Sequence, residues 1–315
     1  MEVMNQKKIL LVALGGNALI KKGQEGSIKE QFENLKLPIR QIARLSKKYK
    51  IIITHGNGPQ VGNLLLQQES CDAVPKLPLE ILVAQTQGQI GYMIESTLDS
   101  ELMDLGIHAR PLVSLISYVV VDEKDPAFHT PTKPIGPIYT ESETACISYP
   151  VRKTSKGYQR VIVSPKPVSI VEKREIKKLI KMDFIVICCG GGGIPVIREG
   201  RKFCGVDAVI DKDLASAKLA EEVGVDIFII ATDVPGAALN YGKSNEKFLQ
   251  SMTIKEAEQY LKEGHFQAGS MKPKVEAAIL FAQSQGKRAV IASIEDIEAA
   301  VTEKGGTALL PLSAN

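Results

Sequence analysis

The chain has 315 residues, of which 44% are hydrophobic and 24% are charged. This balance is typical of a folded globular protein and excludes a chain that is mainly disordered. The 39 Lys and Arg residues and the 36 Asp and Glu residues leave a net charge of +3, spread along the sequence without a basic block. The composition therefore argues against nucleic acid as a partner.

No apolar run approaches the ~20 residues that a membrane-spanning helix needs, so we expect no membrane partner. The residues from Met1 to Lys8 include an early acid and lead into an apolar run too short for a secretion signal. Cys188 and Cys189, two of the five cysteines, are adjacent inside an apolar run, and no cysteine shows the spacing of a zinc site. We therefore expect a cytoplasmic protein without a protein-bound metal.

Short apolar runs alternate along the chain with segments of helical period. The expected strands are Ile9–Leu14, Ile51–Thr54, Arg110–Val121, Val161–Val163, Phe184–Cys189, Asp226–Ala231, Ala289–Ala292 and Thr307–Leu310. The expected helices are Ile28–Lys48, Pro59–Gln68, Pro78–Leu105, Val168–Met182, Asp211–Val223, Thr253–Glu263, Lys272–Gln285 and Ile294–Glu303. This alternation predicts an α/β fold, with a mainly parallel sheet covered on both faces, in a single domain over residues 1–315.

One stretch interrupts this alternation. Five prolines lie between Asp122 and Gly157, so no long helix can cross it. We interpret about residues 122–160 as a protruding subdomain inserted into the α/β body.

Four expected strands end directly in turns of glycine and small polar residues. These turns are Gly15-Gly16-Asn17, His55-Gly56-Asn57-Gly58-Pro59, Gly190-Gly191-Gly192-Gly193 and Thr232-Asp233-Val234-Pro235-Gly236. In a parallel sheet they share the carboxyl edge, where open α/β folds bind ligands. Glycine lets the backbone approach a ligand closely, and the first N–H groups of a following helix suit a phosphate. A single turn of this kind is explained equally well as a tight connection between elements, but four together predict a site for an anionic ligand.

Several segments come close to a common functional motif but do not match it. The segment from Gly56 to Gly62 has one residue too many for G-x-G-x-x-G, which argues against a dinucleotide dehydrogenase. Gly242-Lys243-Ser244 lacks both the earlier glycine and the preceding strand of a phosphate loop, and no G-x-S-x-G elbow occurs. Gly88 and Gly91 interrupt a helical segment, so we expect them to allow close packing of helices or subunits.

Three lysines stand at unusual positions. Lys212 lies between Asp211 and Asp213 where a helix is expected to begin, and Lys274 follows Pro273 at the start of another helix. Each can be a surface charge beside a capping residue, but a lysine at the positive end of a helix gains nothing from the helix dipole. Lys133 lies between two prolines, as in a rigid turn. His55 is the one histidine on a candidate site turn.

Taken together, these segments resemble one family, carbamate kinase, which has the amino-acid-kinase fold. The segments are Ala13–Leu19, Gly56–Gly62, Pro131–Pro137, Gly191–Pro195, Val206–Asp213 and Gly269–Met271. They match in order over nearly the whole chain. The resemblance implies a three-layer αβα sandwich with about eight strands in the central sheet, a protruding subdomain around Lys133, and a homodimer.

The resemblance also implies a reaction: ATP and carbamate give ADP and carbamoyl phosphate reversibly, with Mg²⁺ carried by the nucleotide. Such enzymes run towards ATP in the breakdown of arginine, or of purines and allantoin. The implied catalytic residues are Lys133, Lys212, Asp213 and Lys274. Those expected around the phosphoryl group and carbamate are Gly15, Gly16, Asn17, Gly56, Asn57 and Gly58. Those expected near the nucleotide are Thr232, Asp233, Val234, Tyr241 and Met271.

Two points stay open at the level of sequence. Relatives commonly carry Gly at the position of Lys272, and a bulkier residue there can either perturb the approach of the backbone to the nucleotide or add another cation. The alternatives to carbamate kinase are a family member that phosphorylates a larger carboxylate or phosphonate, and a catalytically silent sensor or structural dimer. The first would need a roomier acceptor pocket with an anchoring cation, and the second predicts loss of the charged residues, which are all present.

Overall fold

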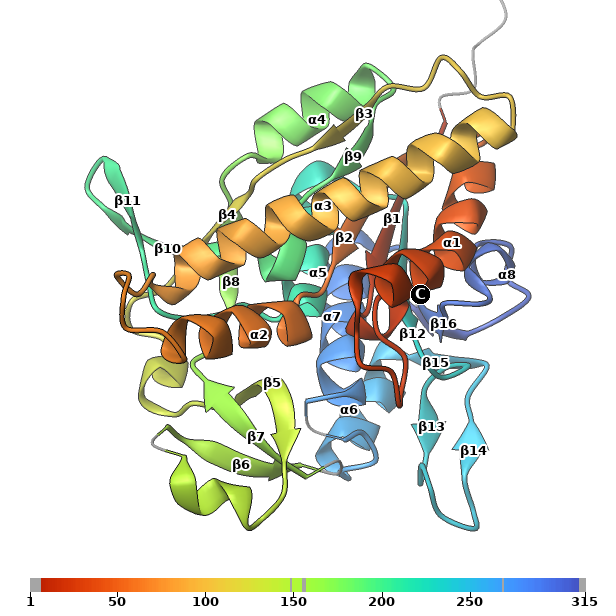
Figure 1. Cartoon of the computed structure of the whole chain (residues 1–315). Helices are drawn as coiled ribbons and strands as arrows, with labels where there is room; N and C mark the ends of the chain where they lie inside the picture. Colours follow the sequence, from red (N-terminus) through yellow and green to blue (C-terminus); the bar gives the residue numbers. More distant parts are fainter. Residues whose placement is uncertain (1–6, 148, 155–156, 268, 312–315) are drawn as a thin grey trace, which may run out of the picture.

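A computed structural model describes residues 7–147, 149–154, 157–267 and 269–311. Its centre is an eight-stranded sheet (Figure 1). The strand order is β15 (Ser251–Thr253), β17 (Thr307–Leu310), β16 (Ala289–Ser293), β12 (Ile227–Thr232), β1 (Ile9–Leu14), β2 (Lys50–His55), β9 (Ile185–Ile187) and β3 (Leu112–Ser114). Neighbouring strands are parallel except β16 and β17. The four central strands β12, β1, β2 and β9 therefore end at one edge.

Helices cover both faces because successive side chains of β1 point to opposite sides. Leu10, Val12 and Leu14 are buried in a core with α1 (Ile28–Leu45), α3 (Leu79–Asp104) and α8 (Ile297–Val301). Leu11 and Ala13 are buried in a second core with α4 (Lys173–Lys181), α5 (Lys212–Val223), α6 (Ile254–Lys262) and α7 (Met271–Gln285). No helix in the described ranges is long and apolar enough to cross a membrane. The predicted αβα sandwich with a mainly parallel sheet is confirmed.

Two smaller sheets flank this body. One contains β11 (Lys202–Gly205), β10 (Ile194–Glu199), β4 (Tyr118–Val121) and β8 (Pro167–Ile170). The other is the hairpin of β13 (Ala238–Leu239) and β14 (Lys247–Phe248). In Figure 1 this hairpin projects from the lower end of the body, towards which β1 runs.

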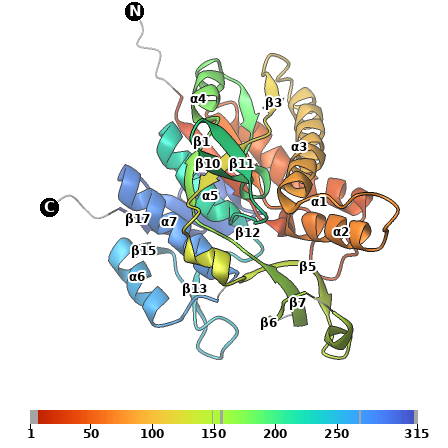
Figure 2. The same cartoon turned by 90° about the vertical axis from the view of Figure 1, so that its left-hand side faces the viewer.

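A third small sheet, which is antiparallel and which we name the outer sheet, consists of β5 (Lys133–Tyr139), β7 (Gly157–Ile162) and β6 (Val151–Thr154). The short 3₁₀ turns η2 (Pro126–His129) and η3 (Glu143–Cys146) precede and follow β5. The outer sheet lies beside α2 (Gly58–Glu69), at the same end of the body as the β13–β14 hairpin, and Figure 2 shows it from the side. The stretch expected to protrude thus carries its own small sheet.

Some expected elements were wrong in extent. The strand expected at Arg110–Val121 is two strands, because the chain leaves the main sheet after Ser114 and joins β10 at Tyr118. Between them, the buried Gln87 side chain accepts from the Ser117 N–H at 2.8 Å and donates at 3.2 Å to the Ser117 carbonyl, which also accepts from the Ile194 N–H of β10 at 2.9 Å. Val161 belongs to the outer sheet, so the eighth strand of the main sheet is the unpredicted β15.

Helix α4 begins later than expected. The expected helix at Val168–Met182 includes residues that pair with β4 as β8, and α4 begins only at Lys173. Strands β10, β11 and β13 to β15 were not predicted, because each is only two to six residues long.

Gly91 lies against the end of β3, which supports its expected packing role. A Cβ at Gly91 would lie 3.1 Å from the Ser114 Oγ, whereas a Cβ at Gly88 would meet nothing within 4 Å. We expect Gly91→Leu to lower the free energy of unfolding by about 1–3 kcal/mol through overpacking. Gly88→Ala should be neutral or stabilise α3 by up to about 1 kcal/mol. Urea unfolding compares the two, and an unchanged stability of Gly91→Leu would contradict this account.

Candidate active site

The turns after β1, β2 and β12 meet backbone to backbone. The Gly15 N–H donates to the Ala231 carbonyl at 3.1 Å, and the Gly56 N–H donates to the Leu14 carbonyl at 3.0 Å. A Cβ at Gly15 would lie 3.0 Å from the Ala231 oxygen, and one at Gly56 would lie 3.4 Å from the Gly16 nitrogen. Glycine at these positions therefore allows the strand ends to approach one another closely.

The turn after β9 packs against the turn after β2. Gly190 to Gly193 follow Cys189, whose φ of 51° is left-handed, and Gly191 to Gly193 also have positive φ. A Cβ at Gly191 would lie 2.2 Å from the Asn57 Nδ2, which donates to the Thr86 Oγ1 at 2.8 Å. The glycines of this turn thus make room for the Asn57 side chain.

Two lysines share one carboxylate at this edge. Helices α5 and α7 pack against each other, which brings their first turns together. The Lys212 Nζ lies 2.5 Å from the Asp213 Oδ1, and the Lys274 Nζ lies 2.9 Å from the Asp213 Oδ2. The Lys212 stem passes over Gly56, whose Cβ, if present, would lie 3.8 Å from it. Because the Asp213 side chain is only 4% exposed, the ion pairs are largely shielded from solvent.

The three groups differ in their affinity for protons. Burial alone would raise the pKa of the Asp213 carboxyl, but the charges of Lys212 and Lys274 outweigh burial and hold this pKa far below its ordinary value. Burial lowers the pKa of Lys212 to about 8, although Asp213 opposes it. Burial also acts to lower the pKa of Lys274, but the attraction of Asp213 outweighs it and the pKa is raised. Lys212 is therefore the first of the two lysines to lose its proton as pH rises.

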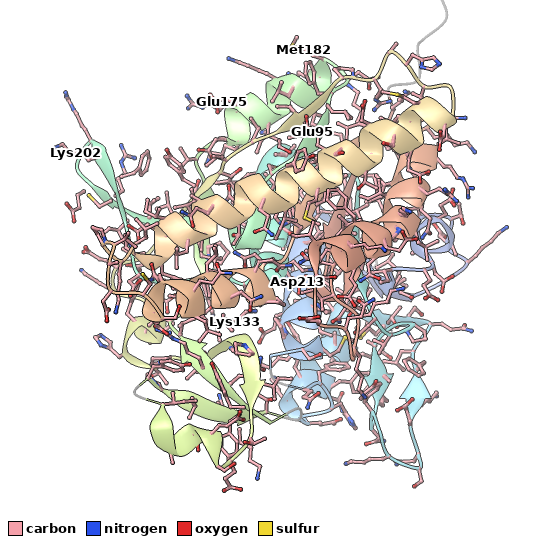
Figure 3. All side chains as sticks on the ribbon, viewed as in Figure 1. Glu95, Lys133, Glu175, Met182, Lys202 and Asp213 are labelled. Carbon is pink, nitrogen blue, oxygen red and sulfur yellow. The ribbon has the colours of Figure 1, made fainter. Side chains whose placement is uncertain are left out.

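Lys133 reaches this cluster from the outer sheet. Its ammonium group pairs with the Asp211 carboxylate, which also caps α5 by accepting from the Asp213 N–H at 2.9 Å. Figure 3 shows Lys133 and Asp213 where the body meets the outer sheet. The sequence indicates only that Asp211 or Asp213 caps this helix and does not predict the pairing of Asp211 with Lys133. The one signal for it is the place of Asp211 before Lys212 in an Asp-Lys-Asp triplet.

The other predicted residues lie at varying distances from the lysines. Asp233 is exposed, but its charge contributes to raising the pKa of Lys274, and Thr232 lies beside Gly15. Tyr241 is 56% exposed on the β13–β14 hairpin, where its ring meets Phe248 edge-on at 6.5 Å. The remaining predicted positions are partly buried at the ends of site elements: Gly16, Asn17, Gly58, Val234 and Met271.

Lys272 points away from the shared carboxylate. Its side chain is 49% exposed and lies 3.9 Å from Glu276, one turn further along α7. The residue that departs from the family pattern is therefore a surface charge. Of the two lysines in α7, Lys274 pairs with Asp213 and Lys272 pairs with Glu276.

The arrangement suits an anionic phosphate ligand. Three ammonium groups and two carboxylates form the ion-paired cluster. Helices α2 and α7 begin beside it, and neither has a side-chain cap on its first turn, although the Lys272 N–H of α7 already donates to the Gln267 carbonyl at 3.1 Å. Unpaired N–H groups at a helix start and nearby cations both favour phosphate.

Comparison with known proteins agrees with this geometry. A sequence profile described as the amino acid kinase family matches residues 8–293. The chain belongs to the amino acid kinase family. This confirms the family expected from the sequence, and the chain is an ATP-dependent kinase of that family.

Individual members of the amino acid kinase family are similar over nearly the whole chain. The carbamate kinase of Thermococcus kodakarensis is 47% identical over 310 residues, which cover 95% of this chain and 98% of that protein. That of Pyrococcus furiosus is 47% identical over 313 residues, with 96% and 99% covered. Among solved structures, carbamate kinase from Giardia lamblia bound to AMP-PNP is 40% identical, with a TM-score of 0.88 and coverage of 98% and 100%.

The burial of His55, the last residue of β2, should make the stability of the protein depend on pH. Its ring is buried, and its Nδ1 lies 3.2 Å from the Gly56 carbonyl oxygen. Burial lowers its pKa from 6.5 to about 4, and the nearby Lys212 charge acts in the same direction. The unfolded chain therefore binds a proton at this residue between about pH 6.5 and 4 while the folded chain does not, so stability falls as pH falls through this window.

We expect the free energy of unfolding to lose about 2 kcal/mol through His55 between pH 7 and pH 5. His55→Asn keeps a donor near Gly56 but cannot titrate, so its stability should depend less on pH by that amount. Urea unfolding at the two pH values measures the difference. The same loss in both proteins would show that His55 is not the group responsible.

Proposed function

We propose that this kinase transfers the γ-phosphoryl group of ATP to carbamate and that the reaction is reversible. The observation that carries the proposal is the cluster of Lys133, Lys212 and Lys274 in a chain up to 47% identical to carbamate kinases. The bond from phosphorus to the ADP oxygen breaks as a bond to a carbamate oxygen forms. Because that oxygen is already anionic, no side chain has to remove a proton from it.

The glycine turns would hold the reacting groups. In this proposal Gly15, Gly16 and Asn17 surround the transferred phosphoryl group, while Gly56, Asn57 and Gly58 surround carbamate. Support comes from the contact between the two turns and from the start of α2, which has no side-chain cap. Backbone N–H groups directed at an anion are already oriented, so they stabilise developing charge without rearranging during the reaction.

The lysines would supply the cations that phosphoryl transfer requires. Negative charge spreads over the equatorial oxygens of the transferring group, and catalysis consists mainly of placement and electrostatic stabilisation. Lys212 and Lys274 would neutralise the phosphates, and Lys133 would contact the transferring group from the outer sheet. Asp213 would keep the first two ammonium groups at a fixed separation. We further propose that residues 122–160 form an inserted subdomain whose role is to present Lys133.

The nucleotide would lie beyond the lysines, near Thr232, Asp233, Val234, Tyr241 and Met271. Among the described residues no three His, Cys, Asp or Glu side chains form a metal cage, and Asp211 and Asp213 already bind ammonium groups. The site therefore fits Mg²⁺ that is bound to the nucleotide phosphates, as is common for this ion. When bound, Mg²⁺ would neutralise phosphate charge alongside the lysines.

We also propose a cytoplasmic homodimer that works towards ATP. Free cysteines at Cys71, Cys188, Cys189 and Cys204 support a reducing compartment. Exposed apolar side chains on α3, among them Tyr92 and Met103, support association of subunits. Breakdown of arginine and breakdown of purines or allantoin are both compatible sources of carbamoyl phosphate.

The proposal is tested by following ATP formation from ADP, Mg²⁺ and carbamoyl phosphate, with acetyl phosphate as a control. We expect ATP to form from carbamoyl phosphate at a rate well above the acetyl phosphate background. Equal rates would contradict a site selective for carbamate. No ATP from either donor would contradict the proposed reaction itself.

The Lys133→Ala variant tests whether Lys133 acts on the transferring group and not in nucleotide binding. Because Lys133 would act on the transferring group, we expect turnover to fall by about 10²–10³-fold. The affinity for ADP, measured by calorimetry, should stay within a few-fold of the parent. A parallel collapse of ADP affinity would place Lys133 in the nucleotide site and contradict its proposed role.

A further inference from the structure

Helix α2 and strand β5 touch through two glycines. A Cβ placed on Gly62 would lie 2.0 Å from the Gly136 Cα and 2.3 Å from its nitrogen. Carbon atoms in contact are normally about 3.5–4.0 Å apart, so even the methyl group of alanine would force the two backbones apart by about 1.5 Å or more. This is the tightest of the glycine contacts in the described parts of the chain.

The two glycines are needed for different reasons. Gly62 lies inside α2, where an alanine would otherwise favour the helix, so its small size is required by the contact alone. Gly136 has a φ of +72°, and the pairing of β5 with β7 shifts register between Ile135 and Tyr139. A left-handed residue at an irregularity of this kind turns the backbone locally, and here it presents Gly136 to α2.

Other contacts hold β5 and β7 against the same helix. Ile135 is 2% exposed and shares a hydrophobic cluster with Val61 and Leu65 of α2. Arg160 of β7 forms an ion pair of 2.5 Å with Glu69 at the end of α2. The outer sheet is therefore fixed along most of the length of α2, and Gly62 marks the point of closest approach.

This helix also begins at the proposed substrate turn. Asn57 is its N-cap and Gly58 its first residue, while Lys133 lies three positions before Gly136 on β5. Helix α2 thus connects the turn that would hold carbamate with the strand that carries Lys133. Gly62 is where α2 and β5 come closest, and the Lys133 ammonium that pairs with Asp211 is carried by the same strand.

We propose that Gly62 and Gly136 are positioning residues for Lys133. Neither touches the reacting groups; their contact sets the separation of α2 and β5 at which the Lys133 ammonium meets the site. The effect on turnover rests on the proposed function, whereas the effect on the Lys133 amine does not. A purely structural role for Gly62 would lower stability without acting through Lys133.

The kinetic test compares Gly62→Ala with Asn63→Ala, which changes the next, exposed residue of the same helix. We expect Gly62→Ala to lower kcat by about 10²-fold, as displacement of a catalytic group by about 1 Å can do, with ADP affinity unchanged. Asn63→Ala should keep the parent kcat. In the Lys133→Ala background, Gly62→Ala should have no further effect on kcat. Losses that multiply in the double variant would overturn the proposal.

A second readout does not depend on activity. Acetylation of the Lys133 amine by an N-hydroxysuccinimide ester, followed by peptide mass spectrometry, reports on its pairing with Asp211. We expect several-fold faster acetylation in Gly62→Ala than in the parent or in Asn63→Ala, at a temperature where all are folded by circular dichroism. Equal rates would overturn the positioning role. If the parent makes no ATP but Lys133 acetylation still rises in Gly62→Ala, the proposed function fails and the positioning role stands.

Discussion

A single buried carboxylate, that of Asp213, holds the site together. Lys212 and Lys274 come from different helices and would repel each other at this separation if the carboxylate were absent. Both also lie at helix starts, where the backbone dipole is already positive. Breaking a buried ion pair by removing one partner costs about 3–5 kcal/mol, because the remaining charge stays buried and unpaired. The position of Asp213 therefore determines where two of the three cations can lie.

The sheet explains why these groups meet. Parallel pairing of β12, β1, β2 and β9 brings four chain turns to one edge, and close packing of α5 on α7 brings Lys212 and Lys274 to the same carboxylate. The outer sheet adds Lys133 from a part of the chain outside this arrangement, so its placement depends on α2. Three ammonium groups from three elements thus join one ion-paired cluster, which suits an anionic ligand.

Much of this could be predicted from the sequence because the signals are local. Apolar runs that end in glycine or small polar residues predicted β1, β2, β9 and β12, and prolines predicted the stretch that leaves the α/β alternation. The pairing of Lys133 with Asp211 joins residues 78 positions apart, and no local pattern specifies it. The same holds for Gly62 and Gly136, whose contact depends on how α2 lies against β5. Where Arg110–Val121 divides into two strands, Ser117 bonds to the side chain of Gln87 in α3, and no local pattern specifies this contact either.

The pH dependence of kcat/KM for ADP tests most directly whether Asp213 controls the cations. Because the pKa of Lys212 in the free protein is about 8, kcat/KM should fall as pH rises through that value. In Asp213→Asn the attraction that favours the Lys212 ammonium is lost, so kcat/KM should begin to fall at a lower pH. Its maximum value should also be lower than in the parent. The same alkaline limb in both proteins would contradict the control of Lys212 by Asp213.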